Sequence, residues 1–362
     1  MTEQSPNGYG DTSAHFDGAI GRTVPAADFP ERNYLTDMEN YDYEGNWGFA
    51  RFDGDDVLAA RFGFGMGGFK WEDWGADASS SNDYLFLQLE LMTSEGAVLW
   101  LCADHFKAGD CRIGDDSHAL TIVENDGTIC DINGWPQTTW RMQTLDDYAA
   151  VDLTAHMETA TIVPDSVLPN NRFAMWIATG SISGTVRWGE HHKSVRGVIF
   201  TDHPRITATH HRVAELGWFH YTPMRLDDGS RLIAYFTRFA DGGRNPEYCF
   251  GCLIRPDGSS VWLQQTAFEH TAFDAHNKPR SWRQTWEAEG LTVTARSSIL
   301  PLPLNRAWGG DVPQSLKDNT NVPNAFDTEM TVTENGADRR LTGGGIYEYI
   351  NTGKGHNPQL SL

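Results

Sequence analysis

Short apolar runs separated by turn-forming residues recur along the whole chain, and this pattern constrains the fold more than any other feature. Asp83 to Met92 alternates apolar and polar residues over its second half, and a Ser-Glu-Gly turn at 94–96 leads into the apolar run Ala97 to Ala103. The second half of the chain repeats the pattern around the turn sequences Asp227 to Gly229 and Pro256 to Gly258. Strand-length runs at short spacing, bounded by Gly, Asp and Pro, are typical of antiparallel sandwiches and barrels.

Helical patterns are few, and the composition agrees with β structure. The best helical candidates are the short segments 144–148 and 311–318. The chain has 36 Gly with 13 Trp, 18 Phe and 11 Tyr, which suits strands, tight turns and a large aromatic-lined interior. Its 362 residues make two domains of ordinary size. Because the strand pattern restarts after residue 205, we predict an all-β fold of two tandem antiparallel barrels. A polar extension would cover 1–32, one barrel 33–204 and the second 205–362.

The charge and the cysteines exclude several classes of partner and location. The net charge is −21 at pH 7 and the sequence pI is about 4.9, a field that repels nucleic-acid phosphates and anionic membrane surfaces. No stretch approaches a membrane span in length, and the polar N-terminal segment lacks the basic and apolar regions of a signal peptide. Five sparse cysteines favour a reducing compartment over a disulfide framework. We therefore expect a cytoplasmic protein that binds neither nucleic acid nor membranes, and we leave a homodimer open.

Three motifs carry a resemblance to a known family. Glu215 to Gly242 combines an aromatic strand, a Leu-Asp-Asp-Gly turn, an apolar strand that ends in Arg238, and an Asp-Gly pair. A Gly-Glu-His-His segment lies upstream at 189–192, and Gly344 to Tyr349 reads Gly-Gly-Ile-Tyr-Glu-Tyr. In this order the motifs resemble the carotenoid 1,2-hydratase-like and attachment-protein-like lipocalin superfamily.

This resemblance implies two lipocalin-like (calycin) barrels and a pocket for an apolar, terpenoid-like small molecule. Activities in the superfamily include hydration of isoprenoid double bonds and, in fungal pathways, cyclisation of the Diels–Alder type, while some members have no known activity. The chain departs from the hydratases in length and in most of the intervening sequence. The resemblance therefore does not carry a particular substrate with it.

Histidines concentrate where the two halves meet. Six of the 13 lie between residues 191 and 220. If the segment around 190 is one extended strand, alternation places Trp188, Glu190 and His192 on one face. By the same rule Trp218 and His220 share a face of the next long strand. An aromatic ring, a carboxyl group and an imidazole on one inward face make an acid–base site beside an apolar ligand. Histidines that pack in the core or lie on the surface of a sheet are the structural alternative.

A site that adds water to an unactivated alkene needs three kinds of side chain. A buried carboxylic acid with a raised pKa protonates one carbon, aromatic faces stabilise the cation, and a histidine takes a proton from the attacking water. The predicted acid–base residues are Glu190, His191, His192, Asp202 and His220. The predicted substrate-binding residues are Trp188, Trp218, Tyr41, Tyr235 and Arg238, with Tyr41 near the mouth of the first barrel.

The function expected from these residues is that of a cofactor-independent lyase, either a hydratase or a dehydratase. Two alternatives remain open. A cyclase would fold a polyene in the pocket with the help of shape and one hydrogen-bond donor. A carrier would hold a lipophile without turnover.

Motifs for metals and cofactors are weak. The doublets at 191–192 and 210–211 place neighbouring imidazoles on opposite strand faces, so each doublet offers one metal ligand. Cys249 to Cys252 is an isolated CxxC, which we interpret as two buried thiols on a strand. Gly63 to Gly68 matches the dinucleotide-binding GxGxxG, but no amphipathic helix follows it. We therefore expect chemistry that uses neither a metal nor a cofactor.

Overall fold

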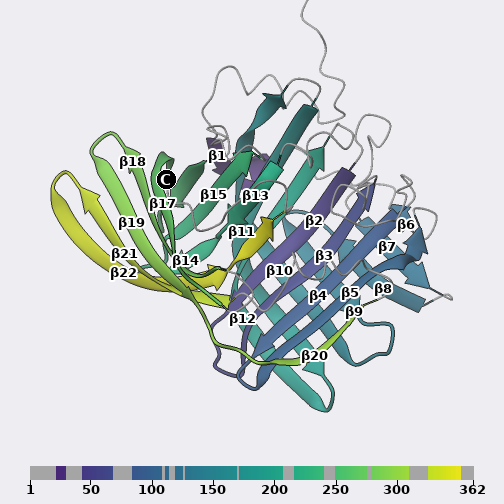
Figure 1. The fold of residues 1–362 in the computed structure, drawn as a ribbon. Helices are drawn as coiled ribbons and strands as arrows, with labels where there is room; N and C mark the ends of the chain where they lie inside the picture. Colours follow the sequence, from purple (N-terminus) through teal and green to yellow (C-terminus); the bar gives the residue numbers. More distant parts are fainter. Residues whose placement is uncertain are drawn as a thin grey trace, which may run out of the picture. The chain divides into compact units, whose positions relative to one another are not determined.

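Strands make up most of the residues that the structure describes, which confirms the all-β prediction (Figure 1). The computed structural model describes residues 22–29, 43–67, 84–107, 111–113, 119–124, 127–168, 171–206, 216–239, 249–274, 279–309 and 325–351. Within these ranges a 3-10 turn at Ala26–Asp28 is the one helical element, and no helix is long and apolar enough to cross a membrane. The chain divides into two compact units, Met1–Arg212 with Pro303–Lys317 and Val213–Leu302 with Asp318–Leu362.

The first unit is built on one curled sheet (Figure 1). Its strands run in the order β20-β5-β4-β3-β2-β12-β11-β10-β9-β8-β7-β6, with β1 paired to β10. Neighbours are antiparallel except β20, which returns from late in the sequence to run parallel to β5. The strands are β1 (Arg22–Pro25), β2 (Tyr43–Phe52), β3 (Val57–Gly67), β4 (Tyr84–Thr93), β5 (Gly96–Lys107), β6 (Cys111–Ile113), β7 (Ala119–Glu124), β8 (Gly127–Asn133), β9 (Gln137–Gln143), β10 (Ala149–Leu168), β11 (Asn171–Trp188), β12 (His191–Ile206) and β20 (Leu304–Gly309).

Three long strands, β10 to β12, form the centre of this sheet. They contain 20, 18 and 16 residues, and one face carries a buried apolar cluster that includes Leu153, Ile182 and Ile199. Gly184 has φ +151°, and a Cβ there would lie 2.1 Å from the Asp152 carbonyl oxygen. Any side chain would force β11 away from β10, so glycine lets the two strands stay paired where the backbone bends.

The second unit is a closed eight-stranded barrel. Hydrogen bonds link β14, β22, β21, β19, β18, β17, β16 and β15 in that order, and β15 pairs back onto β14. Two further strands, β13 and β23, pair with each other at the end of the same sheet. The strands are β13 (Leu216–Tyr221), β14 (Met224–Leu226), β15 (Arg231–Phe239), β16 (Phe250–Ile254), β17 (Ser260–Phe273), β18 (Pro279–Ala288), β19 (Leu291–Ile299), β21 (Ala325–Glu334), β22 (Ala337–Ile346) and β23 (Glu348–Asn351). The closed barrel and the curled antiparallel sheet confirm the predicted lipocalin-like fold class.

Alternation along the strands determines what fills this barrel. Trp282, Gln284 and Trp286 are buried at every second position of β18, and Val293 and Ala295 are buried in the same way on β19. The intervening residues are half-buried or exposed, as expected when one face of each strand forms the core. An amide between two indoles is a polar interruption of an otherwise apolar row.

The turn sequences were a reliable guide, and one helical candidate was wrong. The segments 94–96, 227–229 and 256–258 join neighbouring strands as predicted. The segment 144–148 forms a turn between β9 and β10, because Thr144 Oγ1 and the Asp146 carboxylate accept hydrogen bonds from backbone N–H groups of the turn. The other helical candidate, 311–318, lies outside the described residues.

Candidate functional site

The second barrel encloses a fully buried histidine. His220 lies on β13 and pairs across the sheet with Phe236 of β15 and Tyr349 of β23. Paired residues share a face of a sheet, and Phe236 belongs to the apolar core of the barrel. The imidazole therefore points inward, and it has no exposed surface.

Aromatic rings from distant parts of the chain surround this imidazole. The ring centroids of Tyr347, Phe268 and Trp282 lie 4.4, 4.7 and 4.9 Å from that of His220, and His270 lies 5.5 Å away. Phe268 and Trp282 meet the imidazole nearly edge-on, at 76° and 79°. We call the following residues the His220 cluster: His220, Phe268, His270, Trp282, Gln284 and Tyr347.

The side-chain amide of Gln284 is a polar neighbour of the His220 imidazole. Its Nε2 lies 3.5 Å from His220 Nδ1, and its oxygen has no hydrogen-bond partner among the described residues. A half-turn of the amide exchanges nitrogen and oxygen without changing its shape. As placed, the amide N–H donates to Nδ1 of the neutral imidazole. After the half-turn the amide oxygen would accept Nδ1–H, so Gln284 can accompany either neutral tautomer.

Two further polar atoms of the cluster are buried donors. Trp282 Nε1 and the Tyr347 hydroxyl have no hydrogen-bond partner among the residues that the structure describes. Both residues are nearly inaccessible, at 1% and 3% exposed. Buried polar groups in folded proteins usually have a partner, so these two atoms mark a place where an oxygen of a ligand would be stabilised.

Burial sets the protonation states of the cluster. Desolvation holds the pKa of His220 well below its usual 6.5, and repulsion from His270 lowers it further. Desolvation raises the pKa of Tyr347 well above 10.0, and Tyr349 adds to this. Near pH 7 the cluster therefore combines a neutral imidazole base with neutral hydrogen-bond donors. Such a set can take a proton from carbon or water and stabilise negative charge that develops on an oxygen.

The site predicted around residue 190 has a different structure. β11 ends at Trp188 and β12 begins at His191, so Gly189 and Glu190 form a two-residue turn. Gly189 has φ +52°, a conformation that favours glycine. His191 stacks on Trp188 with ring centroids 4.8 Å apart, while Glu190 and His192 are exposed. The expectation that Trp188, Glu190 and His192 share one inward face is wrong, because the turn reverses the chain between them.

Asp202, predicted as an acid, occupies another part of the first unit. It is buried on β12 and pairs with Trp47 of β2. Eleven residues along β12 separate it from His191, about 35 Å of strand at the usual rise, so these two residues do not share a site. The same sheet buries Arg61, which lies 3.9 Å from Glu90 and over the Trp47 ring at 5.4 Å.

The remaining predicted residues fall into three groups. Tyr235 of β15 pairs with the residue that follows His220, so it faces away from the barrel interior. Because successive residues of a strand point to opposite faces, Tyr235 does not line the interior of the second barrel. Trp218 and Arg238 pair with each other in β13 and β15, and the structure describes their backbone. Tyr41 lies outside the described residues.

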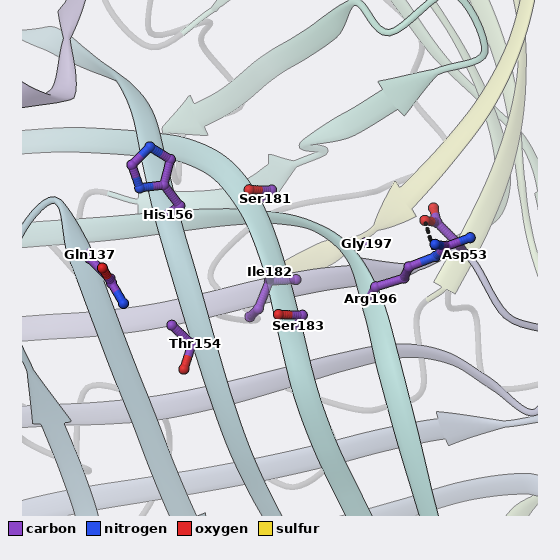
Figure 2. A pocket seen from close by; sticks show the side chains of 9 residues that line it. All are labelled: Asp53, Gln137, Thr154, His156, Ser181, Ile182, Ser183, Arg196 and Gly197. Atoms are coloured by element: carbon purple, nitrogen blue, oxygen red, sulfur yellow. Dashed lines mark ion pairs between the residues drawn. The ribbon is translucent and has the colours of Figure 1, made fainter.

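A hollow lies on the surface of the first unit, and Figure 2 shows its lining. It has a volume of about 560 Å³ and crosses β9 to β12. Its side chains are mostly exposed hydroxyl, amide and imidazole groups, and an Asp53–Arg196 ion pair of 3.7 Å lies among them. Water competes for every hydrogen bond there, so the hollow shelters no reacting group. Its lining is Asp53, Gln137, Thr154, His156, Ser181, Ile182, Ser183, Arg196 and Gly197.

The sequence analysis named His220 as a candidate and did not name the residues that surround it. The sequence of β18 contained a signal. Trp282, Gln284 and Trp286 occupy every second position, so they share one face of the strand. A polar residue between two apolar residues on an inward face suggests a functional position. His270 carried no such signal. Irregularities in the pairing of β17 between Gln265 and Phe273 shift the alternation of that strand.

Cysteine and metal motifs do not contribute to this cluster. Cys249 and Cys252 are buried at β16, and Cys249 Sγ lies 3.5 Å from the Thr237 carbonyl oxygen as a thiol donor. No group of three His, Cys, Asp or Glu side chains among the described residues is arranged to hold a metal ion.

Solved structures with the same fold exist, although no family model and no curated protein matches this sequence. An AttH-like protein from Nitrosomonas europaea is 12% identical, with a TM-score of 0.53 over 90% of this chain and 99% of that chain. Kievitone hydratase from Nectria haematococca is 9% identical, with a TM-score of 0.54 over 92% of this chain and 97% of that chain. The chain therefore has the lipocalin-like fold of these two proteins, which confirms its fold resemblance to the carotenoid 1,2-hydratase-like and attachment-protein-like superfamily.

Proposed function

We propose that this protein is a cofactor-independent lyase that adds water to, or removes water from, an apolar, terpenoid-like small molecule, with His220 as general base. The observation that carries this proposal is the enclosure of His220, a wholly buried imidazole that lies against three aromatic rings. Aromatic walls favour an apolar substrate and exclude bulk water. The sparse cysteines support the cytoplasm as its location.

The carboxyl groups of this unit favour base catalysis over protonation of an alkene. Among the described residues of the second unit, Glu348 is the only buried carboxyl group, at 7% exposed. It pairs with Tyr221, the residue after His220, and therefore faces the other side of the sheet. Among the residues that the structure describes, no carboxylic acid for an acid-first mechanism therefore lies beside His220, and this favours a mechanism that begins with the imidazole as base. Gln284 contacts the imidazole, so we assign it a positioning role.

A cyclase is the second candidate function. The observation that favours it is the pair of buried donors, Trp282 Nε1 and the Tyr347 hydroxyl. Two such donors can hold and polarise a carbonyl group of a folded polyene without any proton transfer.

Water labelling tests the proposal. The purified protein is incubated with EDTA in H₂¹⁸O and a panel of apolar alkenes and alcohols, and products are measured by mass spectrometry. We expect ¹⁸O in the new hydroxyl group with the wild type and a rate at least about 100-fold lower with His220→Asn. His203→Asn is the matched control, because it also removes a fully buried imidazole beside an indole, Trp176 at 4.9 Å, but lies outside the cluster.

The other outcomes decide between the candidates. An isomer of unchanged mass, formed equally by the wild type and His220→Asn, would support the cyclase and contradict the lyase. Unchanged substrate with every member of the panel would count against both enzymes. Equal losses from His220→Asn and His203→Asn would show that burial of any histidine, and not base catalysis, accounts for the effect.

A further inference from the structure

Two buried donors of the His220 cluster belong to rings that both lie against the same imidazole. The Trp282 and Tyr347 rings stack on each other at 4.6 Å and 24°. Each ring also lies against His220, at 4.9 and 4.4 Å. An indole N–H, a phenol O–H and the basic imidazole therefore belong to one small region of the barrel interior.

Leaving these donors without an acceptor is costly. A buried donor that lacks a partner destabilises a fold by about 1–3 kcal/mol, and neither Trp282 Nε1 nor the Tyr347 hydroxyl has a partner among the described residues. Phenylalanine at either position would keep most of the ring packing without this cost. Eight-stranded barrels have room for their own side chains or for one small ligand. An oxygen of such a ligand would satisfy both groups.

We propose that the ligand of this barrel is an apolar carbonyl compound, an enone or a β-hydroxy ketone, whose carbonyl oxygen accepts hydrogen bonds from Trp282 Nε1 and the Tyr347 hydroxyl. This inference rests on the proposed function and specifies its substrate class. The two donors form an oxyanion site, and His220 acts on the carbon next to the carbonyl group.

The chemistry of this arrangement balances without a cofactor. His220 removes a proton from the carbon next to the carbonyl group, and the C–H electron pair forms an enolate whose negative oxygen lies at Trp282 and Tyr347. The enolate electrons then form the C=C bond and expel the hydroxyl group from the β carbon. That leaving group takes the proton from the imidazolium and departs as water. Water addition to an enone is the same sequence in reverse.

The protein matches an enolate better than a carbocation. Neutral hydrogen-bond donors stabilise negative charge on oxygen in a site that excludes water. A tertiary carbocation requires a strong acid for its formation, and the buried carboxyl group of the described second unit, Glu348, faces away from His220. An unactivated alkene is therefore a poor substrate for this cluster.

Binding of 4-nitrophenol tests the oxyanion site directly, because its phenolate is a planar conjugated oxyanion. Calorimetric titration of the full-length protein should show that Trp282→Phe and Tyr347→Phe each raise the Kd by about tenfold or more. Trp286→Phe is the matched control, because Trp286 lies on the same face of β18 with a buried Nε1 that also lacks a partner among the described residues. It packs at Gly251, so it should leave the Kd within about twofold.

A second ligand separates the hydrogen bonds from general packing. The outline of 4-nitrotoluene is similar, but it lacks the oxygen, so Trp282→Phe and Tyr347→Phe should not weaken its binding more than Trp286→Phe does. Equal Kd values for 4-nitrophenol in all four proteins would overturn the oxyanion site. Losses that are equal for both ligands would also overturn it, because they would reflect packing alone.

Proton exchange distinguishes this inference from the proposed function. In D₂O the wild type should exchange the protons next to the carbonyl group of dihydro-β-ionone, an unconjugated ketone that has no hydroxyl group to lose as water. Tyr347→Phe should slow this exchange by about tenfold or more. Exchange without any water addition in the labelling panel would support the enolate site and contradict the lyase. Hydration of an unactivated alkene without exchange would support the lyase and overturn the substrate class.

Discussion

Two of the places where the described residues set an imidazole beside an indole differ in what surrounds the pair. At the turn between β11 and β12, His191 stacks on Trp188 at 4.8 Å and 14°. In the second barrel, His220 meets Trp282 edge-on at 4.9 Å and 79°. The His191 side chain is 42% exposed, whereas His220 has no exposed surface. Residue types and ring distances are thus nearly the same, and enclosure is the difference.

The exposure of each imidazole follows from the position of its residue in the sheet. Trp188 and His191 flank a two-residue turn. Trp188 is buried there, but the hairpin end leaves the His191 side chain 42% exposed. His220 lies within a sheet that closes on itself, and its neighbours come from β17, β18 and β23 as well as from β15. A closed barrel removes water from an inward side chain on every side, and this is what changes its pKa and its chemistry.

The largest expected effect is a difference in turnover between the two places. Once a substrate is known, His220→Asn should lower kcat/KM by about 100- to 10,000-fold, the usual contribution of a general base. A double variant of the hairpin, Glu190→Gln with His192→Ala, should leave kcat/KM within about twofold, because both side chains are exposed. Steady-state kinetics of the three proteins measures this. A large loss of kcat/KM in the hairpin variant would indicate that the catalytic residues lie at the turn, and it would contradict the comparison.

A smaller effect concerns stability and pH. His220 has a lowered pKa in the folded protein, so below pH 6.5 the unfolded chain binds a proton that the folded one does not. Its contribution is fully present above pH 6.5 and is lost as the pH falls, by up to about 1.4 kcal/mol per pH unit. Urea unfolding between pH 7.5 and pH 5 should show this extra slope in the wild type and not in His220→Asn. His270, Tyr347 and Tyr349 face His220 and are present in both proteins, so the difference isolates His220. Identical slopes would contradict its burial as a neutral base.

The fold was predictable from local signals that require little tertiary information. Turn sequences at 94–96, 227–229 and 256–258 mark their hairpins, because Gly and Asp tolerate the backbone angles of tight turns. The turn at Gly189 was missed, although a glycine at the first position of a two-residue loop is a known hairpin signal. The strands on both sides of it are unusually long, so a strand that simply continued was the natural interpretation.

The candidate site was predictable only in part, because sites depend on pairing between strands. Alternation identified His220 as a residue of interest, but it does not say which face of β13 is inward. The positions of Trp282 and Tyr347 beside it follow from closure of the barrel, which no local pattern encodes. Tyr235 illustrates this limit, because a difference of one residue in strand register decides whether a side chain points into the barrel or away from it.

The smallest expected effect compares a surface ion pair near the hairpin strand with a buried hydrogen bond of the barrel. Lys193 Nζ of β12 lies 2.7 Å from Asp56 Oδ2, with both side chains largely in solvent. Asp56→Asn should lower the free energy of unfolding by less than about 0.5 kcal/mol, and 1 M NaCl should abolish the difference. Ser297→Ala removes a buried hydrogen bond of 2.9 Å to Thr328, and should cost about 1 kcal/mol at any salt concentration. Urea unfolding with and without salt measures both. Equal losses that do not respond to salt would show that enclosure does not separate the two regions energetically, and the different chemistry assigned to their histidines would lose its physical basis.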